Sequence, residues 1–183
     1  MSNIKELTME HHRAAERCGF VKVLLSGSID PALYATFLWN QSLKYTELEQ
    51  KANEFNLFNG IENVQRKDYI YRDFKELWEN EWYPITFDST TEYIKHVKSL
   101  SKADDVFSHI YVHHMGDLSG GQIIAKRVPG SGLMYQFEDD TQMLKDEIRS
   151  RTTDDMATEA GVCFQFAIKQ FQELEKLSIN ITA

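Results

Sequence analysis

The segment YVHHMGDLSGGQIIAKRV, residues 111–128, places three glycines in a stretch whose other residues favour a helix. Each glycine inside a helix costs roughly 1 kcal/mol relative to alanine, so three in six residues need a cause. Gly116 and Gly120 fall on one helical face, and with Gly121 they leave a strip without side chains that a flat body can approach closely. They also allow the helix to bend. Tight packing against another helix is the alternative explanation, although one or two small residues would suffice for it.

Residues 118–122, LSGGQ, match the nucleotide-binding signature of transporter ATPases. Such an ATPase also needs a phosphate-binding loop of the form G-x-x-x-x-G-K-[ST], whose backbone N–H groups and lysine hold the phosphates. No Gly-Lys pair occurs in the 183 residues. The sequence therefore argues against an ATPase, and the glycines need another explanation.

The composition is that of a globular protein with a single domain over residues 1–183. The chain is 42% hydrophobic and 26% charged, which is enough for one buried core and short for two. Its formal charge of −8 is unfavourable for binding nucleic acid. Because no signal peptide or membrane-spanning run is apparent, we expect a cytoplasmic monomer without a membrane anchor. Cys18 and Cys163 lie far apart in helical stretches, which predicts two buried free thiols.

The spacing of apolar residues predicts an all-α fold. Intervals of three, four and seven indicate one helix from Ile4 to about Ser26, and Pro31 begins a second that extends to about Phe55. One further helix is expected over about 63–79, and another begins at a capping box at residues 89–92. A helix from about 104 continues through the glycines and IIAKRV, and the last two cover about 139–151 and about 154–178. No run alternates between apolar and polar residues, so we expect almost no β-strand.

Two groups of side chains suit a flat, iron-containing cofactor, which needs an axial nitrogen on one side and free space on the other. His12 shares a face of the first predicted helix with Lys5 and small residues, whereas His11 lies in its apolar stripe. Lys5 is about 10 Å from His12 by helical rise, which is the span from the iron of a heme to its propionates. Lys145 and Arg149 form a second cationic pair on one face. Solvated surface is the alternative for each cation taken singly.

Five segments carry a resemblance to a known family. They are HRAAE at residues 12–16, CGFVKVLLSG at 18–27, the segment at 111–128, LKDEIRSR at 144–151 and AIKQFQELEKL at 167–177. Together they resemble the heme oxygenase family, particularly its soluble bacterial, cyanobacterial and phage-encoded members. The resemblance implies a single-domain multi-helical bundle that holds heme between a proximal N-terminal helix and a kinked, glycine-rich distal helix.

The resemblance also implies roles for individual residues. His12 matches the heme ligand, and Glu16 matches its hydrogen-bonding neighbour. Asp117 matches the aspartate that organises the distal water molecules. The distal glycines are matched by Gly116, Gly120 and Gly121, the basic residues facing the propionates by Lys5, Lys145 and Arg149, and the aromatic positions of the pocket by Tyr111 and Phe164.

The implied activity is the oxidative cleavage of heme b, at once cofactor and substrate, to biliverdin, carbon monoxide and Fe²⁺. The IXα isomer of biliverdin is expected, and the reaction consumes O₂ and external electrons. The chain has no flavin or dinucleotide fingerprint, so a ferredoxin or a flavoprotein reductase is the expected electron donor. A biliverdin reductase is the expected downstream partner.

The sequence departs from the family at two positions and leaves other functions open. His113 stands where arginine is common, and Met9 stands where animal members have a second basic residue. One alternative is a heme storage or delivery protein, against which the distal Asp117 argues. The other is a heme oxygenase-like di-iron oxidase, against which the lack of any Glu-x-x-His pair argues. His109, His113 and His114 could together hold a metal, and histidines without a metal are the alternative.

Overall fold

The computed structural model describes residues 1–182, with side chains up to residue 180. This part of the chain forms helices and contains no β-strand, as expected. The α-helices are α1 (Ile4–Leu7), α2 (Met9–Glu16), α3 (Gly19–Leu25), α4 (Pro31–Glu54), α5 (Lys67–Leu77), α6 (Asp88–Ser99), α7 (Ala103–Leu118), α8 (Gly121–Ile124), α9 (Thr141–Ser150) and α10 (Ala157–Thr182). Three 3₁₀-helices are η1 (Glu62–Val64), η2 (Leu133–Tyr135) and η3 (Asp154–Met156).

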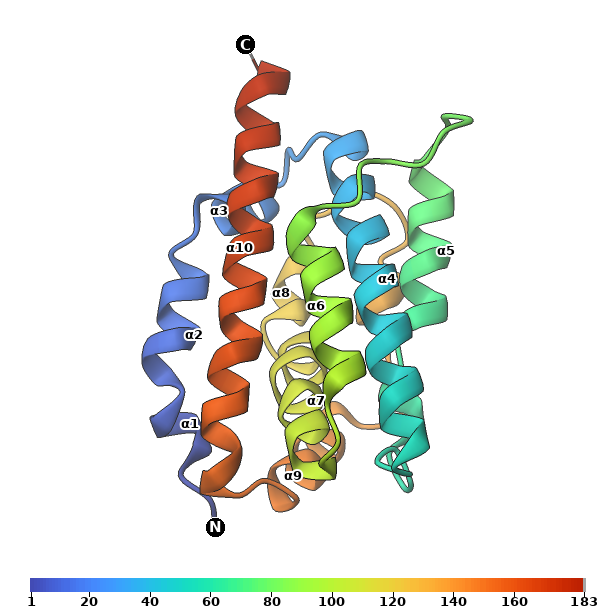
Figure 1. Ribbon diagram of the computed structural model, residues 1–183. Coiled ribbons are helices and arrows are strands. Elements are labelled where there is room, and N and C mark those ends of the chain that lie inside the picture. The colour runs from blue at the N-terminus through green and yellow to red at the C-terminus, as the bar shows by residue number, and fades with distance from the viewer. Residues whose placement is uncertain (183) are drawn as a thin grey trace.

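The last helix, α10, joins the N-terminal helices to the rest of the bundle. It runs between α2 on one side and α6 on the other, with α7 behind it and α4 and α5 farther away (Figure 1). It packs against α2, α3, α6 and α7. Residues of α2 and α7 are therefore brought to one region by a helix that follows both in the chain.

The second predicted helix is confirmed as α4. The side chain of Asp30 accepts a hydrogen bond from the N–H of Leu33 at 2.9 Å, and Pro31 follows at the first helical position. Side chains on most of its surface are buried, because α5, α6, α7 and α10 all pack around it. This burial later matters for Tyr45, which is 1% exposed.

The single helix predicted over residues 4–26 is three helices, so that prediction was wrong. The first break is at Thr8, whose φ is −104° and whose hydroxyl donates to the carbonyl of Ile4 at 2.7 Å. The second break precedes Gly19, which lies against the carboxylate of Glu175 on α10. A Cβ at this glycine would be 2.3 Å from a carboxylate oxygen. The end of the Glu175 side chain thus occupies the space beside Gly19, and a larger residue at this position would displace it.

The glycine-rich helix is also interrupted. α7 ends at Leu118, Ser119 has φ −115° and ψ −94°, and helical structure resumes only for the four residues of α8. Gly121 packs against the ring of Tyr135, where a Cβ would be 2.6 Å from the nearest ring atom. The low helix propensity of glycine favours the break, and the absence of a side chain at Gly121 leaves room for the ring of Tyr135.

The capping box predicted at residues 89–92 does not form. α6 begins at Asp88, and no side chain of its own caps it. The backbone N–H groups of Asp88 and Ser89 instead donate to the carboxylate of Glu173 on α10, at 3.2 Å each. The free N–H groups of this helix start are thus satisfied by a distant helix.

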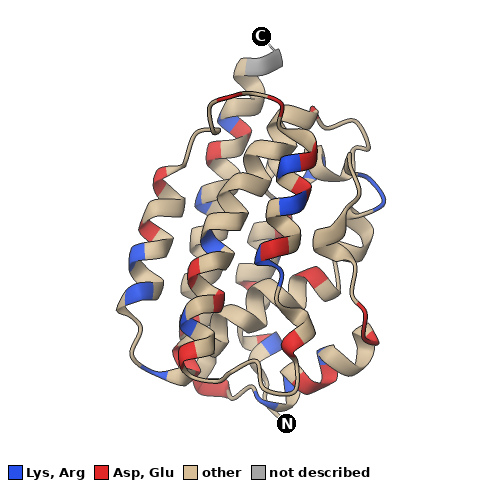
Figure 2. Ribbon diagram, turned by 90° about the vertical axis from the view of Figure 1, so that its right-hand side faces the viewer, with Lys and Arg blue, Asp and Glu red and all other residues tan. Residues whose placement is uncertain are grey.

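Lys and Arg alternate with Asp and Glu along the helices of the face shown in Figure 2, with no large region of one sign. Within residues 1–182, no helix has the length and apolar character needed to cross a membrane. Both cysteines are free, as predicted; Cys163 is buried, whereas Cys18 is only partly so.

Candidate active site

The two adjacent histidines of α2 have different surroundings. The His11 ring stacks on Phe164 of α10, with ring centroids 6.5 Å apart, and covers Gly161. The His12 side chain is 51% exposed, and its Nδ1 lies 3.6 Å from a carboxylate oxygen of Glu16. Its ring edge faces Phe164 at a centroid distance of 5.9 Å. Among the described residues His12 Nε2 makes no hydrogen bond, so this nitrogen is available to a ligand.

Lys5 and His12 do not lie along one helix. The break at Thr8 puts Lys5 on α1 and His12 on α2, so the assumption of one continuous helix behind the inferred distance was wrong. Thr8 and Ala15, which were expected to share that face, are 2% and 9% exposed, whereas Lys5 and His12 are both exposed. Any joint action of the lysine and the histidine therefore depends on how α1 and α2 pack.

The glycines of α7 and α8 divide into two kinds. A side chain at Gly116 or Gly120 would meet nothing within 4 Å, and both residues are exposed. Gly121 is buried against Tyr135 and adds nothing to an open surface. The bare strip predicted from three glycines therefore consists of Gly116 and Gly120, while the third glycine allows the chain to bend.

Asp117 follows Gly116 but points into the protein. It is 6% exposed, and the hydroxyl of Tyr45 on α4 donates to its Oδ2 at 2.7 Å. Burial raises the pKa of Asp117 from 3.8 to about 8, since the lowering by Tyr45 and Arg66 is smaller than the cost of an unsolvated charge. Glu49 adds to the rise. The Asp117 carboxyl therefore keeps its proton at neutral pH.

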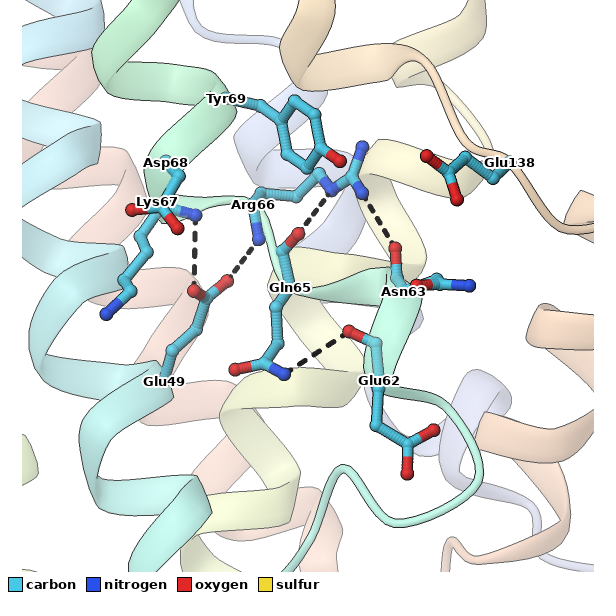
Figure 3. Close-up of a pocket in the computed structure, with 9 residues that line it drawn as sticks. All are labelled: Glu49, Glu62, Asn63, Gln65, Arg66, Lys67, Asp68, Tyr69 and Glu138. Carbon is cyan, nitrogen blue, oxygen red and sulfur yellow. Dashed lines mark hydrogen bonds between the residues drawn. The ribbon is translucent and has the colours of Figure 1, made fainter.

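Glu49 on α4 is fully buried and held by several donors. Its carboxylate accepts hydrogen bonds from the backbone N–H groups of Arg66 and Lys67, drawn in Figure 3 as the two dashed lines that end on Glu49. It also lies 3.1 Å from His114 Nε2. The Arg66 side chain donates in turn to the backbone carbonyls of Asn63, Gln65 and Gln136. These contacts fix α4 against η1 and α7 close to Asp117.

His113 lies in the same buried region and is left without a partner. No described residue bonds its Nε2, while its ring lies 5.3 Å from that of Tyr45 and 5.6 Å from that of Tyr93. Burial, and then the charge of Lys44, lowers the pKa of His113 well below its usual value. This position therefore holds a neutral imidazole, which lacks the permanent charge of an arginine.

The three histidines of α7 do not converge on one point. His109 contacts Tyr93 and Glu159, and His114 contacts Glu49, while His113 has no hydrogen-bond partner among the described residues. These partners lie on three different helices: Tyr93 on α6, Glu159 on α10 and Glu49 on α4. The shared metal site considered for these histidines is not formed.

Tyr111 lies in the middle of α7, five residues before Gly116. Its pKa is raised by burial and lowered in part by a hydrogen bond to Thr8 and by the charge of Arg149. Tyr111 of α7 is therefore close to Thr8, which lies between α1 and α2, and within range of the charge of Arg149 on α9. Arg149 is exposed and bonds Asp146 at 3.0 Å, and Lys145 is half-buried.

Tyr45, Glu49 and Arg66 were not predicted as site residues. One signal for them exists in the sequence: Tyr45 and Glu49, four residues apart, lie on one face of a helix that is otherwise rich in apolar residues. Buried polar groups need partners, so such a face predicts a polar group opposite it. Nothing local indicates that this group is Asp117.

The comparisons with known proteins agree over the whole chain. The family model described as heme oxygenase matches residues 1–173. The chain belongs to the heme oxygenase family. Heme oxygenase of Guillardia theta is 32% identical over an alignment of 206 positions, gaps included, which covers 97% of this chain and 87% of that protein. Heme oxygenase 1 of Synechocystis sp. is 27% identical, over 95% of this chain and 84% of that protein.

Solved heme oxygenase structures have the same fold. The crystal structure of heme oxygenase-1 from Synechocystis in complex with heme superposes with a TM-score of 0.87 at 23% identity, covering 98% of this chain and 93% of that one. The heme oxygenase of Leptospira interrogans gives a TM-score of 0.81 at 25% identity, covering 93% and 97%. The predicted all-α heme oxygenase bundle is confirmed. Members of this family are oxidoreductases that degrade heme, and the chain is an enzyme of this class.

Proposed function

We propose that the protein binds heme between α2 and the glycine-rich end of α7, and converts it to biliverdin, carbon monoxide and Fe²⁺ with O₂ and external electrons. The observation that carries the proposal is the pairing of a free ring nitrogen with a bare helix surface. His12 offers Nε2, and Gly116 and Gly120 leave open space beside them. These residues fit a flat iron porphyrin, which needs a nitrogen ligand and close approach on its other face.

When bound, heme supplies the iron that activates O₂ and the ring that is opened. His12 would provide the iron ligand. A carboxylate oxygen of Glu16 lies 3.6 Å from Nδ1 of the same ring, where its charge favours the tautomer that carries the proton on Nδ1 and leaves Nε2 free for the iron. Phe164 supports the ring of His12 from α10. His11 is engaged with Phe164 and Gly161 and serves packing.

Asp117 holds the proton that the reaction consumes. Its carboxyl is protonated at neutral pH and has a pKa near the operating pH, which is favourable for transfer of a proton in either direction. Tyr45 fixes its orientation by the hydrogen bond to Oδ2. Because Asp117 is buried beside Gly116, it acts on the open side through water rather than by touching the heme.

The basic residues have an orienting role in this proposal. Lys5, Lys145 and Arg149 are the cations that would pair with the two propionates, and Tyr111 of α7 lies within range of the charge of Arg149. Charge-assisted hydrogen bonds contribute about 1.5–3 kcal/mol when desolvated and less at an exposed position. Arg149 is exposed, so its contribution lies at the low end.

Several wider features belong to the same proposal. We expect one domain, a cytoplasmic monomer, the IXα isomer of biliverdin, electrons from a ferredoxin or a flavoprotein reductase, and a biliverdin reductase downstream. A storage or delivery protein would have no need for the buried, protonated Asp117, which favours the enzyme over that alternative.

The test adds hemin to the purified protein, then a reductant and O₂, and follows the absorption spectrum together with carbon monoxide release. We expect the Soret band to disappear and biliverdin to form. A Soret band that survives repeated reduction in air would identify a carrier.

Matched variants test the ligand. His12→Ala is expected to lose the histidine-ligated ferric spectrum, and His11→Ala is the control that retains it with lower stability. The reverse pattern would contradict the assignment. Asp117→Ala is expected to bind heme with nearly unchanged affinity and to form little biliverdin, and an unchanged rate would exclude its role.

A further inference from the structure

Three helices bring two imidazoles and a carboxylate together outside the site described above. His96 Nε2 on α6 and His109 Nε2 on α7 both contact Oε1 of Glu159 in the first turn of α10, the latter at 2.8 Å. One coordinating atom from each residue lies within 4.8 Å of the others. We propose that His96, His109 and Glu159 bind a divalent transition-metal ion of the Zn²⁺ or Fe²⁺ class.

The donor set suits such an ion. Imidazole nitrogen and carboxylate oxygen are common ligands of zinc, iron, cobalt and nickel, whereas Ca²⁺ and Mg²⁺ prefer oxygen alone. Three protein ligands leave at least one coordination position for water or another small ligand. Two histidines with one carboxylate also form the set used by non-heme Fe(II) sites.

Only small movements are needed to admit the ion. Metal–ligand bonds of about 2.1 Å in tetrahedral geometry place the ligand atoms roughly 3.4 Å apart. Without an ion, both imidazole nitrogens lie closer than this to the same oxygen of Glu159; the distance from His109 Nε2 is 2.8 Å. To admit an ion, the distance between each nitrogen and this oxygen has to increase by only about 1 Å or less. Rotation of the side chains alone can provide this movement.

A second layer of contacts already orients one ligand. The hydroxyl of Tyr93 lies 2.9 Å from Nδ1 of His109, on the side of the ring away from Glu159. Metal-bound histidines are commonly fixed in this way through their other nitrogen, which sets the tautomer. His109 is 0% exposed, so its ring cannot turn toward water instead.

The cluster is reachable and its charges are compatible. The side chains of His96 and Glu159 are 26% and 16% exposed, which opens a path from solvent. The nearest buried cation, Lys44, lies 4.9 Å from the centroid of the Tyr93 ring and donates to Gln170, so it is occupied elsewhere. Glu159 contributes the negative charge that partly neutralises a divalent ion.

The site is separate from the proposed heme site. Glu159 and Phe164 are five residues apart on α10, so they point about 140° away from one another around the helix. Phe164 faces α2, and Glu159 faces α6 and α7. The proposed metal site therefore does not depend on the proposed heme chemistry, and each can be tested separately.

The experiment uses the full, untagged, heme-free chain after treatment with EDTA and removal of the chelator. Titration with Co²⁺ is expected to produce saturable visible ligand-field bands with one ion per chain, and Zn²⁺ is expected to displace them. The melting temperature should rise on adding Zn²⁺, because an ion that binds only the folded chain stabilises it.

Two conservative variants locate the ion. His96→Gln and Glu159→Gln are each expected to weaken Co²⁺ binding by at least about 100-fold, and Tyr93→Phe by about 10-fold. His12→Ala is the control, since the exposed His12–Glu16 pair is the other site where a metal could adhere, and it should bind as the wild type does. Far-ultraviolet circular dichroism confirms that each variant is folded.

Three results would overturn the proposal. They are the absence of saturable bands in the wild type, wild-type Co²⁺ affinity in both glutamine variants, and loss of binding in His12→Ala. Hemin binding measured on the same samples should be unchanged in His96→Gln. Failure of the metal site is thus distinguishable from failure of the heme site.

Discussion

Replacement of Asp117 by asparagine should change how stability depends on pH. Asparagine keeps the shape of the side chain and an oxygen that can accept the hydrogen bond from Tyr45, but it cannot ionise. Folding raises the pKa of Asp117 from 3.8 to about 8. Below about pH 4 both the folded and the unfolded chain carry the proton, so the carboxyl has no net effect. Between about pH 4 and about pH 8 only the unfolded chain ionises, which favours unfolding.

The size of the effect follows from the pKa difference. Each pH unit within this window lowers the stability of the wild type relative to Asp117→Asn by about 1.4 kcal/mol. Between about pH 5 and about pH 8 the difference should therefore grow by about 4 kcal/mol, and above pH 8 it should stay constant. Other carboxyls titrate alike in both proteins and cancel.

Urea unfolding of the heme-free proteins, followed by tryptophan fluorescence at several pH values, measures this difference directly. Asp104→Asn is the matched control: Asp104 lies in the first turn of the same helix and is exposed, so this variant should follow the wild type in parallel. If wild type and Asp117→Asn also gave parallel curves, Asp117 would be ionised in the folded protein, and its role as a proton donor would be refuted.

Three further substitutions test packing and hydrogen bonding. Gly121→Ala should lower the free energy of unfolding by about 1–3 kcal/mol, because its Cβ would meet the Tyr135 ring at 2.6 Å. At Gly116 a Cβ would meet nothing within 4 Å, so Gly116→Ala should raise the free energy of unfolding by up to about 1 kcal/mol while weakening hemin binding. Thermal unfolding measures the first effect, and hemin titration measures the second. Arg66→Ala should cost about 2–4 kcal/mol in urea unfolding, since three part-buried carbonyls lose their donor. A loss below about 1 kcal/mol would mean that water replaces the guanidinium.

Local signals in the sequence determined most of the helices. Pro31 and the capping side chain of Asp30 fix the start of α4, and Asp140 caps α9 in the same way through the N–H of Met143. Helical periodicity also separated His11, in the apolar stripe, from His12. These features act within one or two turns, so they can be recognised without knowing the fold.

Contacts between distant segments decided the rest. At the two breaks, Gly19 meets Glu175 and Gly121 meets Tyr135, and neither partner is close in the chain to the glycine it meets.

The proton held by Asp117 has the same kind of origin. Its pKa depends on burial beneath α4 and on Tyr45, 72 residues earlier in the chain. The cluster of His96, His109 and Glu159 likewise needs three helices to converge. Helix formation depends on hydrogen bonds between near neighbours, and a sequence displays these. Desolvation, ligand geometry and close approach depend on which surfaces meet, and only the tertiary structure decides that.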